Sequence, residues 1–126
     1  MLLKVTPEKL GEVWGKAYEW LAPAIERDGL VTKETVYDGL KSGYNQLWVC
    51  ETAAAVTCLE DYAKERVCFI WLAGGSDLSK IKENMIFIEA WAFENGCSRM
   101  RVTGRKGWLR VFKDYSEPYI TMEKKI

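Results

Sequence analysis

The sequence predicts a single α/β domain with a mixed sheet. Residues 6–40 show helical spacing of apolar side chains, whereas residues 46–73 hold short segments rich in β-branched and aromatic residues. Strand and helix signals then alternate to residue 124. Three consecutive strands suggest an antiparallel meander, and strand–helix–strand suggests a parallel unit, with helices on both faces of the sheet. No linker or repeat divides residues 1–126, so one domain is expected.

The N-terminal third is predicted to hold an edge strand and two helices. Residues 1–5 form a short apolar stretch that suits an edge strand. Thr6 and Pro7 are typical of a helix start, and Asp28-Gly29 marks that helix's end, with Pro23 expected to kink or interrupt it. A second helix is predicted over residues 32–40, capped by Thr32.

Three strands are predicted over residues 46–52, 54–59 and 67–73. The third, VCFIWLA, is apolar on both faces, which is typical of a central strand. A helix over residues 77–95 then leads to a strand over 99–103, and these two flanking strands should lie adjacent and parallel.

The C-terminal part is predicted to contain one more helix and one more strand. The helix begins at Lys106 or Gly107 and ends at Tyr115. Residues 119–124, YITMEK, alternate between apolar and polar side chains, as a strand does.

Composition narrows the possible functions. Lys+Arg and Asp+Glu both number 18, which gives no sign of a nucleic-acid or membrane partner. No stretch has the length of a membrane span or of a signal-peptide apolar region, so a cytoplasmic location is expected. The chain has no histidine, and its four cysteines form no CxxC pair, so no metal site is expected. We predict that Cys50, Cys58 and Cys68 are buried, unpaired thiols.

The stretch WLAGGSDLSK, residues 71–80, raises the main functional question. A strand that passes through glycines into a helix N-terminus can cradle a phosphate, because the first N–H groups of a helix are unpaired and its dipole end is positive. The alternative is a plain turn in which Ser76 and Asp77 cap the helix.

The element order, with Asn95-Gly96-Cys97 leading into RMRVTGR, resembles the GNAT superfamily of N-acetyltransferases over nearly the whole chain. Residues 89–115 also look like small GNAT-like proteins of bacteriophages and prophages. The resemblance implies that acetyl-CoA, if it binds, lies between the strands 67–73 and 99–103. The residues implied to hold it are Leu72, Ala73, Gly74, Gly75, Ser76, Asp77 and Arg105.

The chain departs from the family pattern at the cofactor loop. The family has Gln or Arg, two residues, Gly, one residue, then Gly or Ala, and residues 75–80 read GSDLSK instead. Leu78 stands where a small residue is expected, and Asp77 places a negative charge where the anion would lie.

The family's catalytic positions are also altered. The tyrosine that protonates the leaving thiolate in the family corresponds here to Phe112 or Lys113. Tyr115 is the nearby candidate, with a core or cap residue as the alternative. Glu51 is the candidate general base, with a solvated glutamate at a strand end as the alternative.

Two functions therefore stay open. One is a non-catalytic GNAT-like protein of phage or prophage type, which binds a phage or host protein, needs no cofactor, and is found in the host cytoplasm or the virion. The other is an acetyl-CoA-dependent N-acetyltransferase with a divergent cofactor loop.

Overall fold

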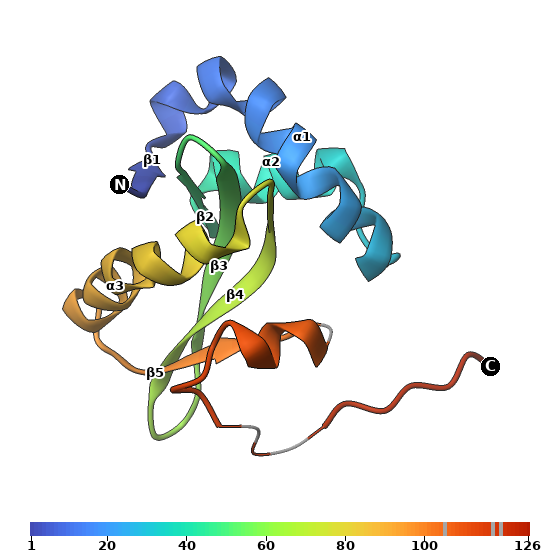
Figure 1. Ribbon diagram of the computed structural model, residues 1–126, viewed down its shortest axis with the longest axis vertical. Helices are drawn as coiled ribbons and strands as arrows, with labels where there is room; N and C mark the ends of the chain where they lie inside the picture. Colours follow the sequence, from blue (N-terminus) through green and yellow to red (C-terminus); the bar gives the residue numbers. More distant parts are fainter. Residues whose placement is uncertain (105, 117, 119) are drawn as a thin grey trace.

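A computed structural model describes residues 1–104, 106–116, 118 and 120–126, apart from the side chains of residues 78, 79, 81 and 106. Its elements follow the chain in the order β1 (Leu3–Val5), η1 (Pro7–Lys9), α1 (Leu10–Asp28), α2 (Lys33–Ser42), β2 (Asn45–Val49), β3 (Ala53–Asp61), β4 (Arg66–Gly75), α3 (Leu78–Glu94), β5 (Cys97–Val102) and η2 (Lys106–Arg110). Figure 1 shows their arrangement in space.

The strands of the described residues form one mixed sheet in the order β1-β2-β3-β4-β5. Neighbours from β1 to β4 are antiparallel, whereas β4 and β5 are parallel and are connected through α3. The predicted meander and the predicted parallel β-α-β unit are therefore both confirmed.

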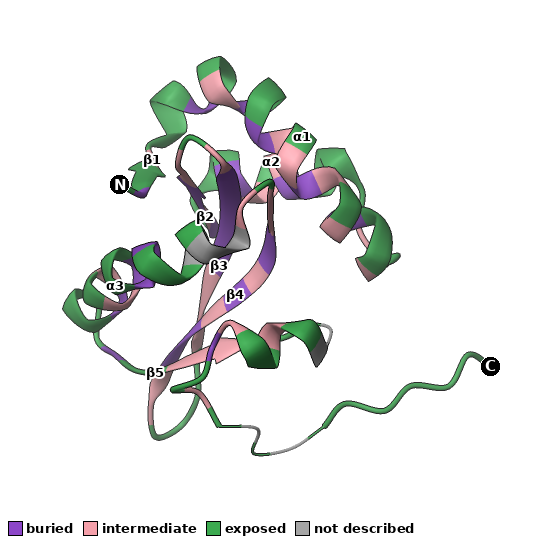
Figure 2. Cartoon of the chain, viewed as in Figure 1, coloured by how far each residue is buried: buried purple, intermediate pink, exposed green. Residues whose placement is uncertain are grey.

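Helices cover both faces of the sheet, as predicted. Helices α1 and α2 pack on one face, where Leu21 and Val36 join Val56 and Leu72 in a core cluster. Helix α3 packs on the other face, where Ile88 joins other buried residues, among them Trp48, Ile70 and Ala73. Figure 2 shows that burial falls along β3 toward its hairpin with β4, which projects beyond the helices.

Two of the local helix signals, Thr32 and Gly29, act as the sequence indicates. The Thr32 Oγ1 accepts a hydrogen bond from the Thr35 backbone N–H at 3.2 Å and so caps α2. Gly29 ends α1 with a φ of 72°, a value that glycine adopts without strain. Helix α1 continues through Pro23 without interruption, so the predicted interruption is wrong, whereas the kink stays a prediction. Pro23 and Glu19, whose carbonyl loses its helical partner, are both exposed, so water can hydrogen-bond that carbonyl.

The two C-terminal predictions are wrong in part. In place of a helix over 106–115, the chain forms the short 3-10 helix η2 and then turns, because Trp108, Phe112 and Tyr115 all pack toward the α3-side core. Of the predicted strand 119–124, residues 120–124 form no strand, and residue 119 lies outside the described residues. A strand needs a partner, and this segment runs away from the sheet (Figure 1).

All four cysteines are free thiols, which confirms the predicted absence of a bridge among Cys50, Cys58 and Cys68. Cys68 is buried as predicted, but Cys50 and Cys58 are only half-buried. Cys50 follows the last residue of β2, and Cys58 lies on the part of β3 where burial declines. No helix in the described part of the chain is long and apolar enough to cross a membrane.

Candidate cofactor site

Strands β4 and β5 diverge at their carboxyl ends. They pair from Arg66 with Cys97 to Ile70 with Val102. Beyond Ile70, β4 continues to Gly75 without β5 beside it. Within the described residues, the stretch 71–75 therefore has β3 on one edge and no strand on the other. The divergence occurs where the family resemblance places acetyl-CoA, and open backbone groups along β4 are suited to a pantetheine amide.

A β-bulge begins this divergence. Val56 pairs with Leu72 and Thr57 pairs with Ile70, so Trp71 has no partner across the β3–β4 ladder. The extra residue bends its strand, as bulges do. The indole Nε1 of Trp71 donates a hydrogen bond to Asp28 Oδ2 at 3.2 Å, which ties the bulge to the end of α1.

Gly74 and Gly75 belong to strand β4, not to the turn that the sequence suggested. Neither has a positive φ. A Cβ on Gly74 would run into the backbone carbonyl of Trp20 in α1, and one on Gly75 would lie 2.7 Å from the Ala53 Cα. Both glycines therefore serve close backbone packing, and neither is needed to admit a phosphate.

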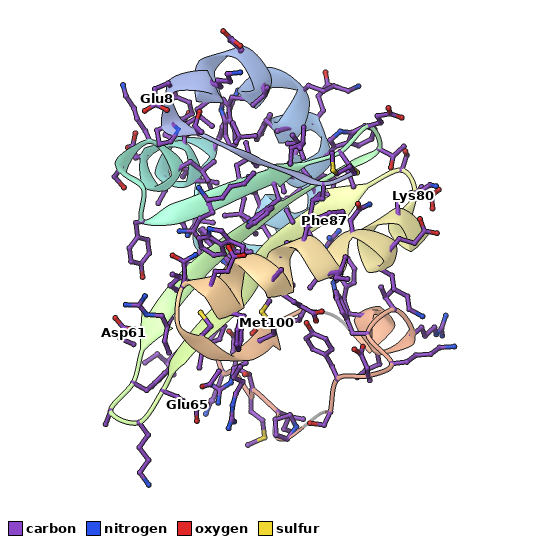
Figure 3. All side chains as sticks on the ribbon, turned by 90° about the vertical axis from the view of Figure 1, so that its left-hand side faces the viewer. Glu8, Asp61, Glu65, Lys80, Phe87 and Met100 are labelled. Carbon is purple, nitrogen blue, oxygen red and sulfur yellow. The ribbon has the colours of Figure 1, made fainter. Side chains whose placement is uncertain are left out.

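The loop between β4 and α3 is poorly suited to a pyrophosphate. The backbone N–H of Ser76 donates to the Thr52 carbonyl at 2.9 Å, so this donor is already used within the protein. Asp77 stands directly before α3, half-buried, and its carbonyl accepts from the Lys80 N–H at 3.2 Å. Figure 3 shows Lys80 near the start of α3. The engaged Ser76 N–H and the Asp77 carboxylate therefore do not favour a pyrophosphate at this loop.

The other implied cofactor residues contribute little chemistry. The Leu72 side chain is buried in the core cluster on the α1 side, and Ala73 in the cluster on the α3 side, so each offers only backbone atoms. Arg105 lies outside the described residues.

Glu51 and Tyr115, the two catalytic candidates, lie next to different elements of the fold. Glu51 is exposed in the turn between β2 and β3, next to Thr52, whose carbonyl contacts Ser76. Tyr115 instead donates its hydroxyl to Glu89 Oε2 at 2.8 Å, in the middle of α3.

The surroundings of Tyr115 favour a neutral phenol. Burial raises the pKa of Tyr115 above its usual range, and the hydrogen bond to Glu89 raises it further. Its ring centroid lies 5.1 Å from that of Phe112, which is itself buried, whereas Lys113 is exposed. Tyr115 therefore anchors the turn after η2 onto α3, and its hydroxyl proton is used in the hydrogen bond to Glu89.

Among the surface hollows of the described residues are two that sequence reasoning did not find. One, of about 330 Å³, lies between α3 and the turn after η2, and its lining includes Met85, Glu89, Phe112 and Tyr115. The other, of about 260 Å³, is lined by residues that include Lys4, Gln46 and Trp91. Neither is lined by a residue of the stretch 72–77, and both depend on long-range packing that leaves no local sequence signal. No group of three Cys, Asp or Glu side chains in the described part could hold a metal ion.

Comparison with known proteins identifies the fold. No protein-family model matches the sequence, and no curated protein matches it. Solved structures do match over the whole chain. A transcriptional regulator from Bacillus halodurans C-125 superposes with a TM-score of 0.71 at 13% identity, covering 100% of this chain and 99% of that one. A GCN5-related N-acetyltransferase from Ralstonia eutropha JMP134 gives 0.69 at 14% identity, with 100% and 97% covered.

A predicted acetyltransferase with acetyl-CoA from Clostridium acetobutylicum gives a TM-score of 0.67 at 11% identity, covering 98% of this chain and 95% of that one. Identities this low show the fold alone. The chain therefore has the GNAT fold that the sequence predicted. None of these three descriptions mentions a phage, so the phage resemblance stays a prediction.

Proposed function

We propose that this protein uses the GNAT fold as a non-catalytic scaffold and acts through contact with another protein, as a virion, assembly or host-interaction component of a phage or prophage. One observation carries the non-catalytic part. At the start of α3, where a GNAT enzyme would hold the pyrophosphate of acetyl-CoA, the Ser76 N–H is bound to the Thr52 carbonyl and Asp77 brings a negative charge.

The energies support this interpretation. An exposed helix N-terminus attracts an anion by about 0.3–1 kcal/mol, whereas micromolar affinity requires about 8 kcal/mol. The remainder would have to come from β4 backbone contacts and from a loop in which the Ser76 N–H is already bonded and Asp77 carries a carboxylate. Acetyl-CoA binding at cellular concentrations is therefore not expected.

The surface supports a protein partner. On α3, the side chains of Ile86 and Phe93 are 64% and 79% exposed, and Phe87 is 39% exposed (Figure 3 labels Phe87). Exposed apolar side chains gathered on one helix are typical of interaction surfaces. The phage assignment rests on the resemblance of residues 89–115.

The second candidate is an acetyl-CoA-dependent N-acetyltransferase with a divergent cofactor loop. The divergence of β4 and β5 favours it, because the β4 edge over 71–75 stays open to a ligand. Glu51 would be its candidate base. Tyr115 would first have to break its hydrogen bond to Glu89.

Thermal unfolding with and without 1 mM acetyl-CoA separates the two candidates. A ligand present at about 1,000 times its Kd stabilises the folded state by about 4 kcal/mol, which for a domain of this size raises Tm by about 10 °C or more. We expect a rise below about 2 °C, the same as in a buffer matched for ionic strength. A large rise specific to acetyl-CoA would favour the enzyme.

A further inference from the structure

Strand β5 leaves one edge of the sheet without a partner. It is the last strand in the sheet order and pairs with β4 on one side, and no strand of the described residues lies on its other side. The backbone N–H and C=O groups along such an edge are a template for a further strand.

Residues 120–126 form an extended segment that pairs with no strand of the described residues. Its residues form no helix or strand, all are exposed, and the segment runs away from the sheet in Figure 1. Ile120 and Met122 are 69% and 84% exposed, and they alternate with Thr121 and Glu123. Two apolar side chains on one face and two polar ones on the other form the pattern of a half-buried strand.

The two faces of β5 match this pattern. Met100 and Val102 pack against the α3-side core and remain half-buried, so they could cover Ile120 and Met122. Arg99 and Arg101 alternate with them and therefore lie on the opposite face. Glu123 of an added strand would lie on that arginine face, where Arg99 already pairs with Glu65 at 3.2 Å. The apolar side chains therefore set the orientation, and Glu123 would add a second carboxylate beside Arg99.

We propose that residues 120–124 of one copy add as a strand to the β5 edge of a second copy, in a symmetric dimer. The segment leaves the body on the α3 side, where Tyr115 is bound to Glu89, and is directed away from its own β5. When each copy adds its residues 120–124 to the other copy, the β5 edges of both copies are paired. This is the geometry of a closed two-fold interface. The inference does not depend on whether acetyl-CoA binds.

Sedimentation velocity and hydrogen exchange test this dimer. We expect the wild type to sediment at twice the 14.5 kDa chain mass, with the amides of residues 120–124 protected from exchange. The double variant Ile120→Asp/Met122→Asp should sediment as a monomer with those amides unprotected. Because both side chains are exposed within one copy, the variant should keep its circular dichroism spectrum.

A matched double variant, Leu3→Asp/Leu30→Asp, serves as the control. Leu3 and Leu30 are 56% and 85% exposed. Leu3 lies in β1, at the opposite edge of the sheet from β5, and Leu30 follows α1, so this variant should remain a dimer. Glu123→Arg should weaken the dimer about two- to five-fold at low salt, the range for a surface ion pair.

Three results would overturn the proposal. The first is a monomeric wild type, including one whose 120–124 amides are protected, since that would mean that the segment folds onto its own β5. The second is a dimer that survives Ile120→Asp/Met122→Asp. The third is a dimer broken by Leu3→Asp/Leu30→Asp alone, which would assign the interface to the β1 edge or to the end of α1.

Discussion

Asp77 combines a negative charge with a position directly before α3. Asp77→Asn keeps the side-chain shape and removes the charge, so anions should bind more tightly at this loop. Charge effects at a helix N-terminus are about 0.3–1 kcal/mol, which corresponds to about two- to five-fold in affinity for acetyl-CoA. An NMR chemical-shift titration, which follows binding at millimolar ligand, measures this ratio. The exposed Asp38 of α2 supplies the control Asp38→Asn, which should change nothing. Equal or weaker binding by Asp77→Asn would contradict the charge argument.

Cys68 makes stability depend on pH. Burial raises the pKa of this thiol from 9.0 to about 12. In the unfolded chain the thiol ionises from about pH 9, so its contribution to stability is complete below pH 9 and is lost as pH rises toward 12. Burial also raises the pKa of Cys58, to about 11, so Cys58 acts in the same range.

We therefore expect the free energy of unfolding, measured in urea with a reductant, to fall between pH 8.5 and pH 10. Cys68→Ala should lower stability at every pH, because it leaves a cavity, but should make the decline with pH shallower. An unchanged decline in the variant would show that Cys68 ionises as readily in the folded protein as in the unfolded chain.

At the scale of elements, α1 approaches β4 through glycine. The Cβ of an alanine at position 74 would meet the Trp20 carbonyl, so Gly74→Ala should force α1 and β4 apart and cost about 1–3 kcal/mol. Gly15, in the exposed middle of α1, has nothing within 4 Å of an added Cβ, and Gly15→Ala should stabilise by about 0.5–1 kcal/mol. Urea unfolding of both variants measures the contrast. If Gly74→Ala left the free energy of unfolding unchanged, close packing would not require glycine at position 74, and the missing side chain could instead serve a ligand.

The elements that the sequence predicted well carry strong local signals. VCFIWLA is apolar on both faces, and the helix that follows has an apolar line with a glycine stop at Gly96, whose φ is 85°. The C-terminal elements failed because their state depends on distant groups. The turn after η2 follows from ring packing and from the Tyr115–Glu89 hydrogen bond, and residues 120–124 lack a neighbouring strand.

The candidate site was located by the sequence but not characterised by it. The order of elements placed a loop between a central strand and a helix, and the structure has that loop. The use of the Ser76 N–H by the Thr52 carbonyl depends on how β3 pairs with β4, and the role of Gly74 depends on where α1 packs. Such long-range contacts cannot be deduced from local residue patterns.

At the scale of the whole molecule, the GNAT architecture does not by itself imply acetyltransferase activity. The sheet, its two helical layers and the divergence of β4 from β5 are all present, yet the fold alone does not decide function. We propose that the start of α3 does not bind acetyl-CoA and that the surface of the scaffold contacts another protein.

Isothermal titration of the wild-type protein with acetyl-CoA tests this central claim most directly. We expect no saturable heat up to about 1 mM ligand, which corresponds to a binding free energy weaker than about 4 kcal/mol. A control titration with a salt of matched ionic strength accounts for heats of dilution. Saturable binding at micromolar concentration, with one site per chain, would contradict the account and assign the protein to the acetyl-CoA-dependent enzymes.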